Sequence, residues 1–208
     1  MSKQSIWTFF KQHTQLPEEA IAGIMGNMEA ESNCEACRVQ GDFTADRRTS
    51  KQYAQDVNAG TISRNSFMYD AKGWGLCQWT FYSRKQNLYH TCQSYGTGIE
   101  DETTQLRFFL AEMQTEYPAV WKALLNATTI QEAARVVCVD YERPAVPNVV
   151  ARTDYGQQIY NKFHGKDLDP EPEPDPAEDW LQDWIEYLEA EKQRIQTKIE
   201  ELKARRSR

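Results

Sequence analysis

The sequence predicts a mainly α-helical domain with a small β-hairpin lobe, followed by a linker and a separate C-terminal helix. Three observations support this α+β class. Apolar side chains repeat at helical spacing in several segments before residue 165, and glycines interrupt the region between them. The composition then changes abruptly to alternating acids and prolines. With 208 residues, 40% of them hydrophobic, the chain can bury a core without disulfide or metal support.

The N-terminal part begins with two predicted helices. We expect the first over residues 5–13. The second opens at Pro17-Glu18-Glu19, because proline fits the first helical position and acidic side chains are favoured at the positive end of the helix dipole. Glycines at positions 23 and 26 should allow close packing. The apolar face of this helix consists of Ile21, Ile24, Met25 and Met28.

The region between the second helix and about residue 100 has a different character. Gly41, Gly60, Gly73 and Gly75 occur there among polar and aromatic residues. Glycines in such surroundings are typical of turns and loops. We therefore expect loops and a small β-hairpin in this region.

Three more helices are predicted before residue 165. Apolar residues at helical spacing predict one over residues 101–115. The segment Thr129-Ile-Gln-Glu132 matches a capping box, and the helix that it starts should end before Pro144. The last predicted helix covers about residues 148–163.

Two further segments follow a domain that we expect over residues 1–164. Residues 165–178 alternate acid with proline, which favours an extended spacer. Residues 179–208 lack glycine and proline and carry a heptad repeat, although some partner positions are charged. We expect a coiled-coil-like helix that forms a homo-oligomer or docks on a partner. The repeat consists of Leu181, Leu188, Ile195 and Leu202.

Charge and cysteine usage exclude several function classes. The net charge of −7 argues against nucleic-acid binding, since phosphate recognition needs clustered Lys and Arg. No apolar run approaches the roughly 20 residues that span a bilayer, and the first residues do not form a secretory signal, so we expect a cytoplasmic product without membrane insertion. The five cysteines fit reduced thiols. Cys34 and Cys37 lack a second ligand pair for zinc, and we expect no metal and no cofactor.

Two glutamates near the end of the second predicted helix are candidate catalytic acids. A carboxyl group held against apolar side chains has a raised pKa, which makes it a usable general acid near neutral pH. Glu29 and Glu31 both lie on the flanks of the apolar stripe. Spacing alone does not choose between them, and both could be solvated carboxylates at a helix end.

Several ordered motifs give the chain a resemblance to a known family. The segment Ala20-Ile-Ala-Gly-Ile-Met-Gly-Asn-Met-Glu-Ala-Glu-Ser32 resembles a helix of the phage tail lysozyme family, a lysozyme-like group found in phage and prophage lysins. In that family the glutamate before the serine is the catalytic acid, so the resemblance implies this role for Glu31. Further segments match in the same order over nearly all of residues 1–164: Gly73-Trp-Gly-Leu-Cys-Gln-Trp79 with Arg84, Gln105-Leu-Arg-Phe-Phe-Leu110, Tyr141-Glu-Arg-Pro144 and Ala151-Arg-Thr-Asp-Tyr155.

The resemblance also implies a set of substrate contacts. Gly75-Leu-Cys-Gln78 is similar to the Gly-Leu-Met-Gln segment that lines the sugar cleft of goose-type lysozymes and lytic transglycosylases. By this similarity Gln78 would hydrogen-bond the substrate. Trp74 and Trp79 would offer flat faces to sugar rings, although both could equally pack in the core. The remaining candidates are Ser32, Arg84 and Tyr141, of which Tyr141 could instead form a structural pair with Arg143.

Glycoside hydrolysis usually needs a second carboxylate besides the acid. Asp70 lies five residues before Gly75, close to the spacing of a water-positioning aspartate in goose-type lysozymes, and is our first choice. Asp42 is the alternative. A turn aspartate beside Lys72 is an equally ordinary role for Asp70.

The resemblance implies a phage or prophage lysin whose partner is bacterial peptidoglycan. We expect an N-acetylmuramidase that cleaves the β-1,4 bond between N-acetylmuramic acid and N-acetylglucosamine. Two alternatives stay open. One is a lytic transglycosylase that forms anhydromuramyl products, and the other is a non-catalytic module for wall binding or virion structure. Such a protein would reach the wall through holin-type release or as a virion component.

Overall fold

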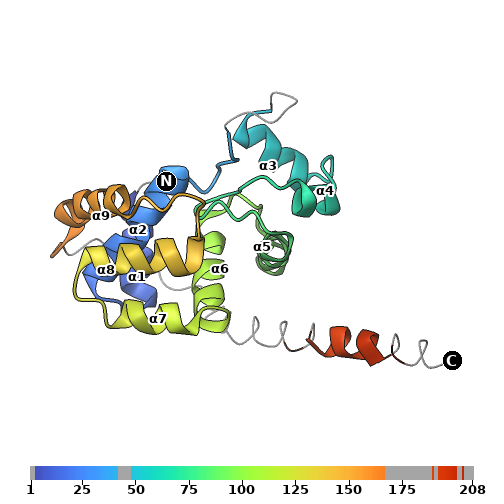
Figure 1. Cartoon of the computed structure of the whole chain (residues 1–208). Helices are drawn as coiled ribbons and strands as arrows, with labels where there is room; N and C mark the ends of the chain where they lie inside the picture. Colours follow the sequence, from blue (N-terminus) through green and yellow to red (C-terminus); the bar gives the residue numbers. More distant parts are fainter. Residues whose placement is uncertain (1–2, 42–47, 167–188, 190–191, 201–202, 204–208) are drawn as a thin grey trace. The chain divides into compact units, whose positions relative to one another are not determined.

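The first of two compact units, Met1–Pro170 and Glu171–Arg208, is built from helices (Figure 1). The computed structural model describes residues 3–41, 48–166, 189, 192–200 and 203. In Figure 1, α6 stands between the bundle formed by α1, α2, α7, α8 and α9 and the lobe formed by α3, α4 and α5. The elements are α1 (Lys3–His13), α2 (Glu18–Ser32), α3 (Ser50–Asn58), α4 (Arg64–Tyr69), α5 (Tyr82–Tyr95), α6 (Glu102–Thr115), α7 (Pro118–Leu125), α8 (Ile130–Val136), the π-helix η1 (Val137–Glu142) and α9 (Val149–Phe163).

Helix α2 is the central helix of the bundle and packs against α8 and α9. Helices α2 and α9 approach closely because each has a glycine that faces the other. A Cβ atom at Gly26 would lie 2.2 Å from the carbonyl oxygen of Arg152, and one at Gly156 would lie 2.8 Å from that of Ala22. Without side chains at these positions the two helices cross at short range. The crossing brings the side chain of Arg152 to the last turn of α2.

The helices predicted outside the lobe are confirmed, and three of them begin with a side-chain cap. The predictions over residues 5–13, 101–115 and 148–163 correspond to α1, α6 and α9. Asp101 and Asn148 precede their helices and accept hydrogen bonds from backbone N–H groups of the first turn. Thr129 caps α8 in the same way, and α8 continues directly into η1, which ends at Glu142. Pro17 is likewise the residue before α2 and not its first helical residue.

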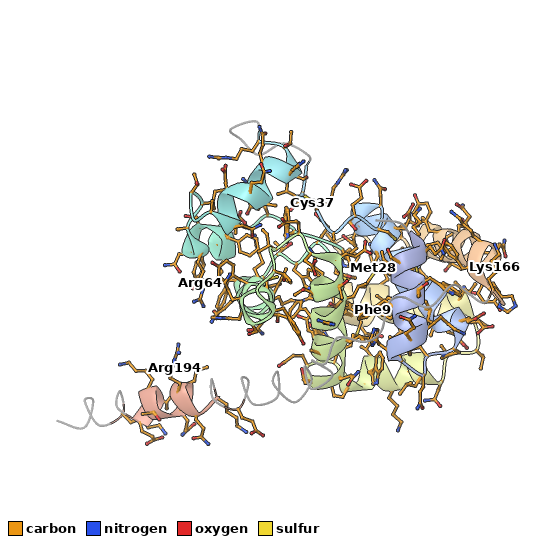
Figure 2. All side chains as sticks on the ribbon, turned by 180° about the vertical axis from the view of Figure 1, so that it is seen from behind. Phe9, Met28, Cys37, Arg64, Lys166 and Arg194 are labelled. Atoms are coloured by element: carbon orange, nitrogen blue, oxygen red, sulfur yellow. The ribbon has the colours of Figure 1, made fainter. Side chains whose placement is uncertain are left out.

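The lobe around α3 and α4 differs from the sequence prediction. Up to about residue 100 we expected loops and a β-hairpin, whereas the described residues form three helices, α3, α4 and the 14-residue α5, and isolated antiparallel bridges between Val39, Trp74 and Trp79. The hairpin is therefore not confirmed. Helices α3 and α4 form because Thr49 provides a capping box and Ser63 accepts the backbone N–H of Ser66. Figure 2 shows Cys37 and Arg64 in this part of the chain, whereas Phe9 and Met28 lie among the side chains of the bundle.

The second unit is described over one helical stretch, residues 192–200. Ile195 and Ile199 are exposed on it. The other heptad residues, Leu181, Leu188 and Leu202, lie outside the described residues, as does the predicted linker beyond Lys166. Self-association or docking through residues 179–208 therefore stays a prediction. None of the described helices is long and apolar enough to cross a membrane.

Candidate active site

A pocket of about 560 Å³ opens where the end of α2 meets the lobe. Its size is that of a typical small-molecule or sugar site. Side chains from distant parts of the sequence converge on it, and carboxyl and guanidinium groups predominate among the polar ones. The lining consists of Glu31, Arg38, Val39, Gln40, Gly41, Cys77, Gln78, Thr80, Phe81, Arg84, Glu142, Pro144 and Ala145.

Glu31 reaches this pocket from the last turn of α2, and Arg152 of α9 holds it there. Oε1 of Glu31 accepts a hydrogen bond of 2.6 Å from Nη2 of Arg152. Nη1 of the same guanidinium donates to Oδ1 of Asn27 at 3.0 Å. Asn27 is buried and donates in turn to the carbonyl oxygens of Gly23 and Ala134. A chain of hydrogen bonds through the bundle therefore fixes the position of the Glu31 carboxyl group.

Ser32 does not line the pocket but connects two segments that do. Its side chain is buried, and Oγ lies 3.0 Å from the carbonyl oxygen of Met28 and 2.9 Å from that of Leu76. The hydroxyl group thus ties the end of α2 to the segment that carries Gln78. We expected Ser32 to contact substrate, but the structure gives it this positioning role.

Gln78 lines the pocket, as the resemblance implied, in a strained backbone conformation with φ of 46°. Nε2 of Gln78 donates to the carbonyl oxygen of Gly75 at 2.9 Å and to that of Arg38 at 3.2 Å. The turn before it requires glycine, since Gly75 has a φ of 74° and a Cβ there would lie 2.4 Å from Oε1 of Gln105. Gln105 also accepts the backbone N–H of Leu76 at 2.9 Å. The buried Gln105 side chain therefore shapes the whole turn.

Trp74 and Trp79 do not offer the open faces that we expected, and Tyr141 is not among the residues that line the pocket. Trp74 and Trp79 are 0% exposed and Tyr141 is 1% exposed. The indole N–H of Trp74 donates to the carbonyl oxygen of Ile99, and that of Trp79 lies 3.2 Å from both Glu112 and Tyr141. All three rings belong to the core beneath the pocket, because their polar atoms find partners there and their faces pack against other aromatic rings.

Arg84 lines the pocket and is held in a fixed orientation by Glu112. Nε and Nη2 of Arg84 contact the two carboxylate oxygens of Glu112 at 2.6 and 2.7 Å. The hydroxyl group of Tyr141 donates to the same carboxylate at 2.6 Å, and the guanidinium lies 4.4 Å from the centre of the Tyr141 ring. A bidentate ion pair of this kind fixes the plane of the guanidinium group.

Asp70, our first choice for the second carboxylate, is not among the residues that line the pocket. Its carboxylate accepts hydrogen bonds from Nζ of Lys85 at 2.6 Å, from the backbone N–H of Lys72 at 3.0 Å and from the hydroxyl group of Tyr53. Lys85 is fully buried, and burial lowers the pKa of its ammonium group while the pair with Asp70 opposes this effect. Asp70 therefore acts as the counter-ion of a buried lysine. The alternative, Asp42, lies outside the described residues.

Glu142, which we did not single out from the sequence, is a second carboxyl group in the pocket. It is the last residue of η1, and Arg143 after it adopts a left-handed conformation with φ of 52° that ends the helix. Oε1 of Glu142 is inaccessible to solvent and has no hydrogen-bond partner. Burial raises the pKa of Glu142 to about 8, with the positive charge of Arg84 opposing the effect. The sequence signal for this residue was its place in the motif Tyr141-Glu-Arg-Pro144.

Within the described residues, no group of three or more His, Cys, Asp or Glu side chains is placed to hold a metal ion. Cys34 is buried, and burial raises the pKa of its thiol strongly. Cys77, the cysteine in the pocket lining, also has its pKa raised by burial. Neither thiol is in surroundings that would activate it as a nucleophile.

Comparison with known protein families identifies the family of this chain. The family model described as "Phage tail lysozyme" matches residues 2–163. The chain belongs to the phage tail lysozyme family. The resemblance seen in the sequence motifs is thereby confirmed, and the match ends where α9 ends, at Phe163. As a member of the phage tail lysozyme family, the chain carries a lysozyme-like, peptidoglycan-active domain.

Proposed function

We propose that the protein is an N-acetylmuramidase that hydrolyses the β-1,4 bond between N-acetylmuramic acid and N-acetylglucosamine, with Glu31 as the proton donor. The observation that carries the proposal is the position of Glu31, the last-turn carboxyl of α2, in a pocket large enough for a sugar unit. Family membership supports the choice of substrate. Glu29, the other glutamate considered, pairs with Lys3 at 2.6 Å and is not part of the pocket lining.

The surroundings of Glu31 suit a group that gives up a proton to a glycosidic oxygen. After the transfer the carboxylate is negative, and Arg152 at 2.6 Å is in place to stabilise it. Asn27 keeps the guanidinium in this orientation, so little rearrangement is needed during the reaction. Positioned proton donors of this kind typically accelerate a reaction by about 10²–10⁴-fold.

Exposed aromatic rings beside the pocket suit a sugar polymer that extends out of it. Phe81 lines the pocket and is 74% exposed. The next residue, Tyr82, stacks on Tyr69 with ring centroids 5.4 Å apart, and both rings are also exposed. Flat apolar faces in such positions can pack against pyranose rings. We therefore propose that these rings, in place of Trp74 and Trp79, contact the glycan strand.

The test is mass spectrometry of fragments released from purified Gram-positive peptidoglycan, after borohydride reduction. Reduced muramic acid ends from the wild type, and none from Glu31→Gln, are the expected result. Glu116→Gln is the matched control, since Glu116 is exposed and distant in sequence from every lining residue. Equal melting temperatures would show that Glu31→Gln remains folded.

Three other outcomes would contradict the proposal. Anhydromuramyl ends would identify a lytic transglycosylase that uses the same acid. A substantial rate in Glu31→Gln would remove Glu31 from its role. Binding of peptidoglycan by the wild type without any released fragment would favour a non-catalytic wall-binding module.

A further inference from the structure

Two carboxyl groups face one pocket, and their surroundings differ. Glu31 has a cation of its own, because Arg152 contacts its Oε1 at 2.6 Å. Glu142 lines the same pocket from the end of η1, with one oxygen buried and without a hydrogen-bond partner. A buried polar atom without a partner is costly to maintain and calls for a functional explanation.

We propose that Glu142 is the second carboxyl group of the reaction and that it is the source of the proton that Glu31 donates. This inference rests on the proposed hydrolysis of peptidoglycan. It replaces Asp70, whose carboxylate is occupied by Lys85, Lys72 and Tyr53 outside the pocket lining.

The charges around Glu142 support a proton on one of the carboxyl groups of the site. Two arginines act on it, and each already has a carboxylate partner: Arg84 pairs with Glu112, and Arg152 pairs with Glu31. Glu142 is thus a third carboxyl group beside two cations, and no ion pair among the described residues includes it. Charge balance in this enclosed site is reached when one carboxyl group is protonated.

The titratable groups that act on Glu142 come from every side of the site. They are Glu31 of α2, Cys77 of the loop before α5, Arg84 of α5, Glu112 of α6, Cys138 and Tyr141 of η1, and Arg152 of α9. Burial raises the pKa of Glu142 to about 8, the negative charges of Glu31 and Glu112 add to this, and the two arginines oppose it. At neutral pH the resting proton is therefore on Glu142.

One proton is sufficient for a complete cycle of hydrolysis. Because Glu142 has no hydrogen bond to Glu31, its proton passes through solvent in the pocket to Glu31. Glu31 donates it to the glycosidic oxygen as the bond from that oxygen to the anomeric carbon breaks. The Glu142 carboxylate then takes a proton from water, whose oxygen forms the new bond to the anomeric carbon. Both carboxyl groups return to their starting states, and the net change is the addition of one water molecule across the bond.

The experiment measures initial rates on a suspension of purified peptidoglycan for the wild type, Glu31→Gln, Glu142→Gln, Glu142→Ala and the control Glu116→Gln. Glu142→Gln should lower kcat by about 10²–10⁴-fold, as the loss of an acid–base group does. Its melting temperature should not fall. The wild-type rate should decrease above about pH 8, where Glu142 loses its proton, and this decrease should be absent from the residual activity of Glu142→Gln.

Chemical rescue separates a reacting carboxyl group from a structural one. Glu142→Ala leaves space in the pocket for sodium azide, which attacks the anomeric carbon without needing a base. Because this variant also lacks the proton of Glu142, the rescue is measured near pH 5, where solvent supplies the proton that Glu31 donates. Azide should therefore raise the rate of Glu142→Ala at least 10-fold and yield a glycosyl azide by mass spectrometry, and it should not rescue Glu31→Gln.

The possible outcomes distinguish the inference from the proposed function. A Glu142→Gln rate within twofold of the wild type, combined with an inactive Glu31→Gln, would overturn the inference and leave the muramidase intact. The inference would also be overturned if Glu142→Gln were slow and azide failed to raise the rate of Glu142→Ala. Glu142 would then be a positioning residue. Absence of fragments from the wild type would overturn the proposed function itself.

Discussion

Replacement of Glu142 by glutamine should stabilise the protein in a pH-dependent way. The folded protein holds the proton of Glu142 up to about pH 8, whereas the unfolded chain releases it near the ordinary value of 4.5. Between these two values the folded state binds more protons than the unfolded state, so the stability of the wild type falls as pH rises. Glutamine carries no titratable proton and is free of this effect.

The magnitude follows from the two pKa values. Each pH unit between them corresponds to about 1.36 kcal/mol. The wild type should therefore be less stable than Glu142→Gln by about 3 kcal/mol at pH 7 and by about 5 kcal/mol at pH 8 and above. At pH 4 the two proteins should be equal. These differences are large beside a typical unfolding free energy of about 5–15 kcal/mol.

Urea unfolding followed by tryptophan fluorescence would measure the difference at pH 4, 6 and 8. Buried Trp7, Trp74 and Trp79 report on the core. Glu116→Gln should follow the wild type at every pH. A difference between wild type and Glu142→Gln that did not change with pH, or a variant less stable at pH 8, would refute the reasoning, since either result means that Glu142 is ionised and satisfied in the folded protein.

Three more predictions address other parts of the site. Asp70→Ala leaves the buried Lys85 without its counter-ion and should cost about 3–5 kcal/mol in thermal unfolding; kcat per folded molecule should hold, and a loss of kcat at unchanged stability would return Asp70 to catalysis. Phe81→Ala should raise KM for peptidoglycan at least threefold with kcat nearly constant, whereas a fall confined to kcat would argue against a glycan contact. Gly26→Ala pushes a Cβ against Arg152 and should lower both the melting temperature and the rate, so wild-type values of both would contradict the close crossing of α2 and α9.

The helices that could be predicted are those with a regular apolar repeat or a clear cap. Asp101, Thr129 and Asn148 mark starts that the structure reproduces. Helices α3 and α4 could not be predicted in the same way, because nine and six residues give too short a repeat and glycines surround them. Their caps, Thr49 and Ser63, were present in the sequence, but many serines and threonines have no such role.

The site was less predictable than the fold, since burial depends on the tertiary arrangement. The placement of Gln78 in the pocket agrees with the resemblance, because the turn at Gly75 is a local property of the sequence. The resemblance did not predict that Trp79 is buried and Phe81 exposed, because both are large aromatic residues near the same turn. Glu142 lacks any periodic signal that would reveal how deeply its carboxyl group is enclosed.

The π-helix that carries Glu142 has an evolutionary consequence. Val137–Glu142 continues α8 without a break, and a π turn holds about one residue more than an α turn. Removal of one residue from this stretch would restore a regular α-helix and move Glu142 by one helical position, about 100° around the helix axis. Glu142 would then leave the pocket while the helices around it kept their packing. A single codon inserted into an ancestral helix could thus have added a second carboxyl group to an active site that previously had one.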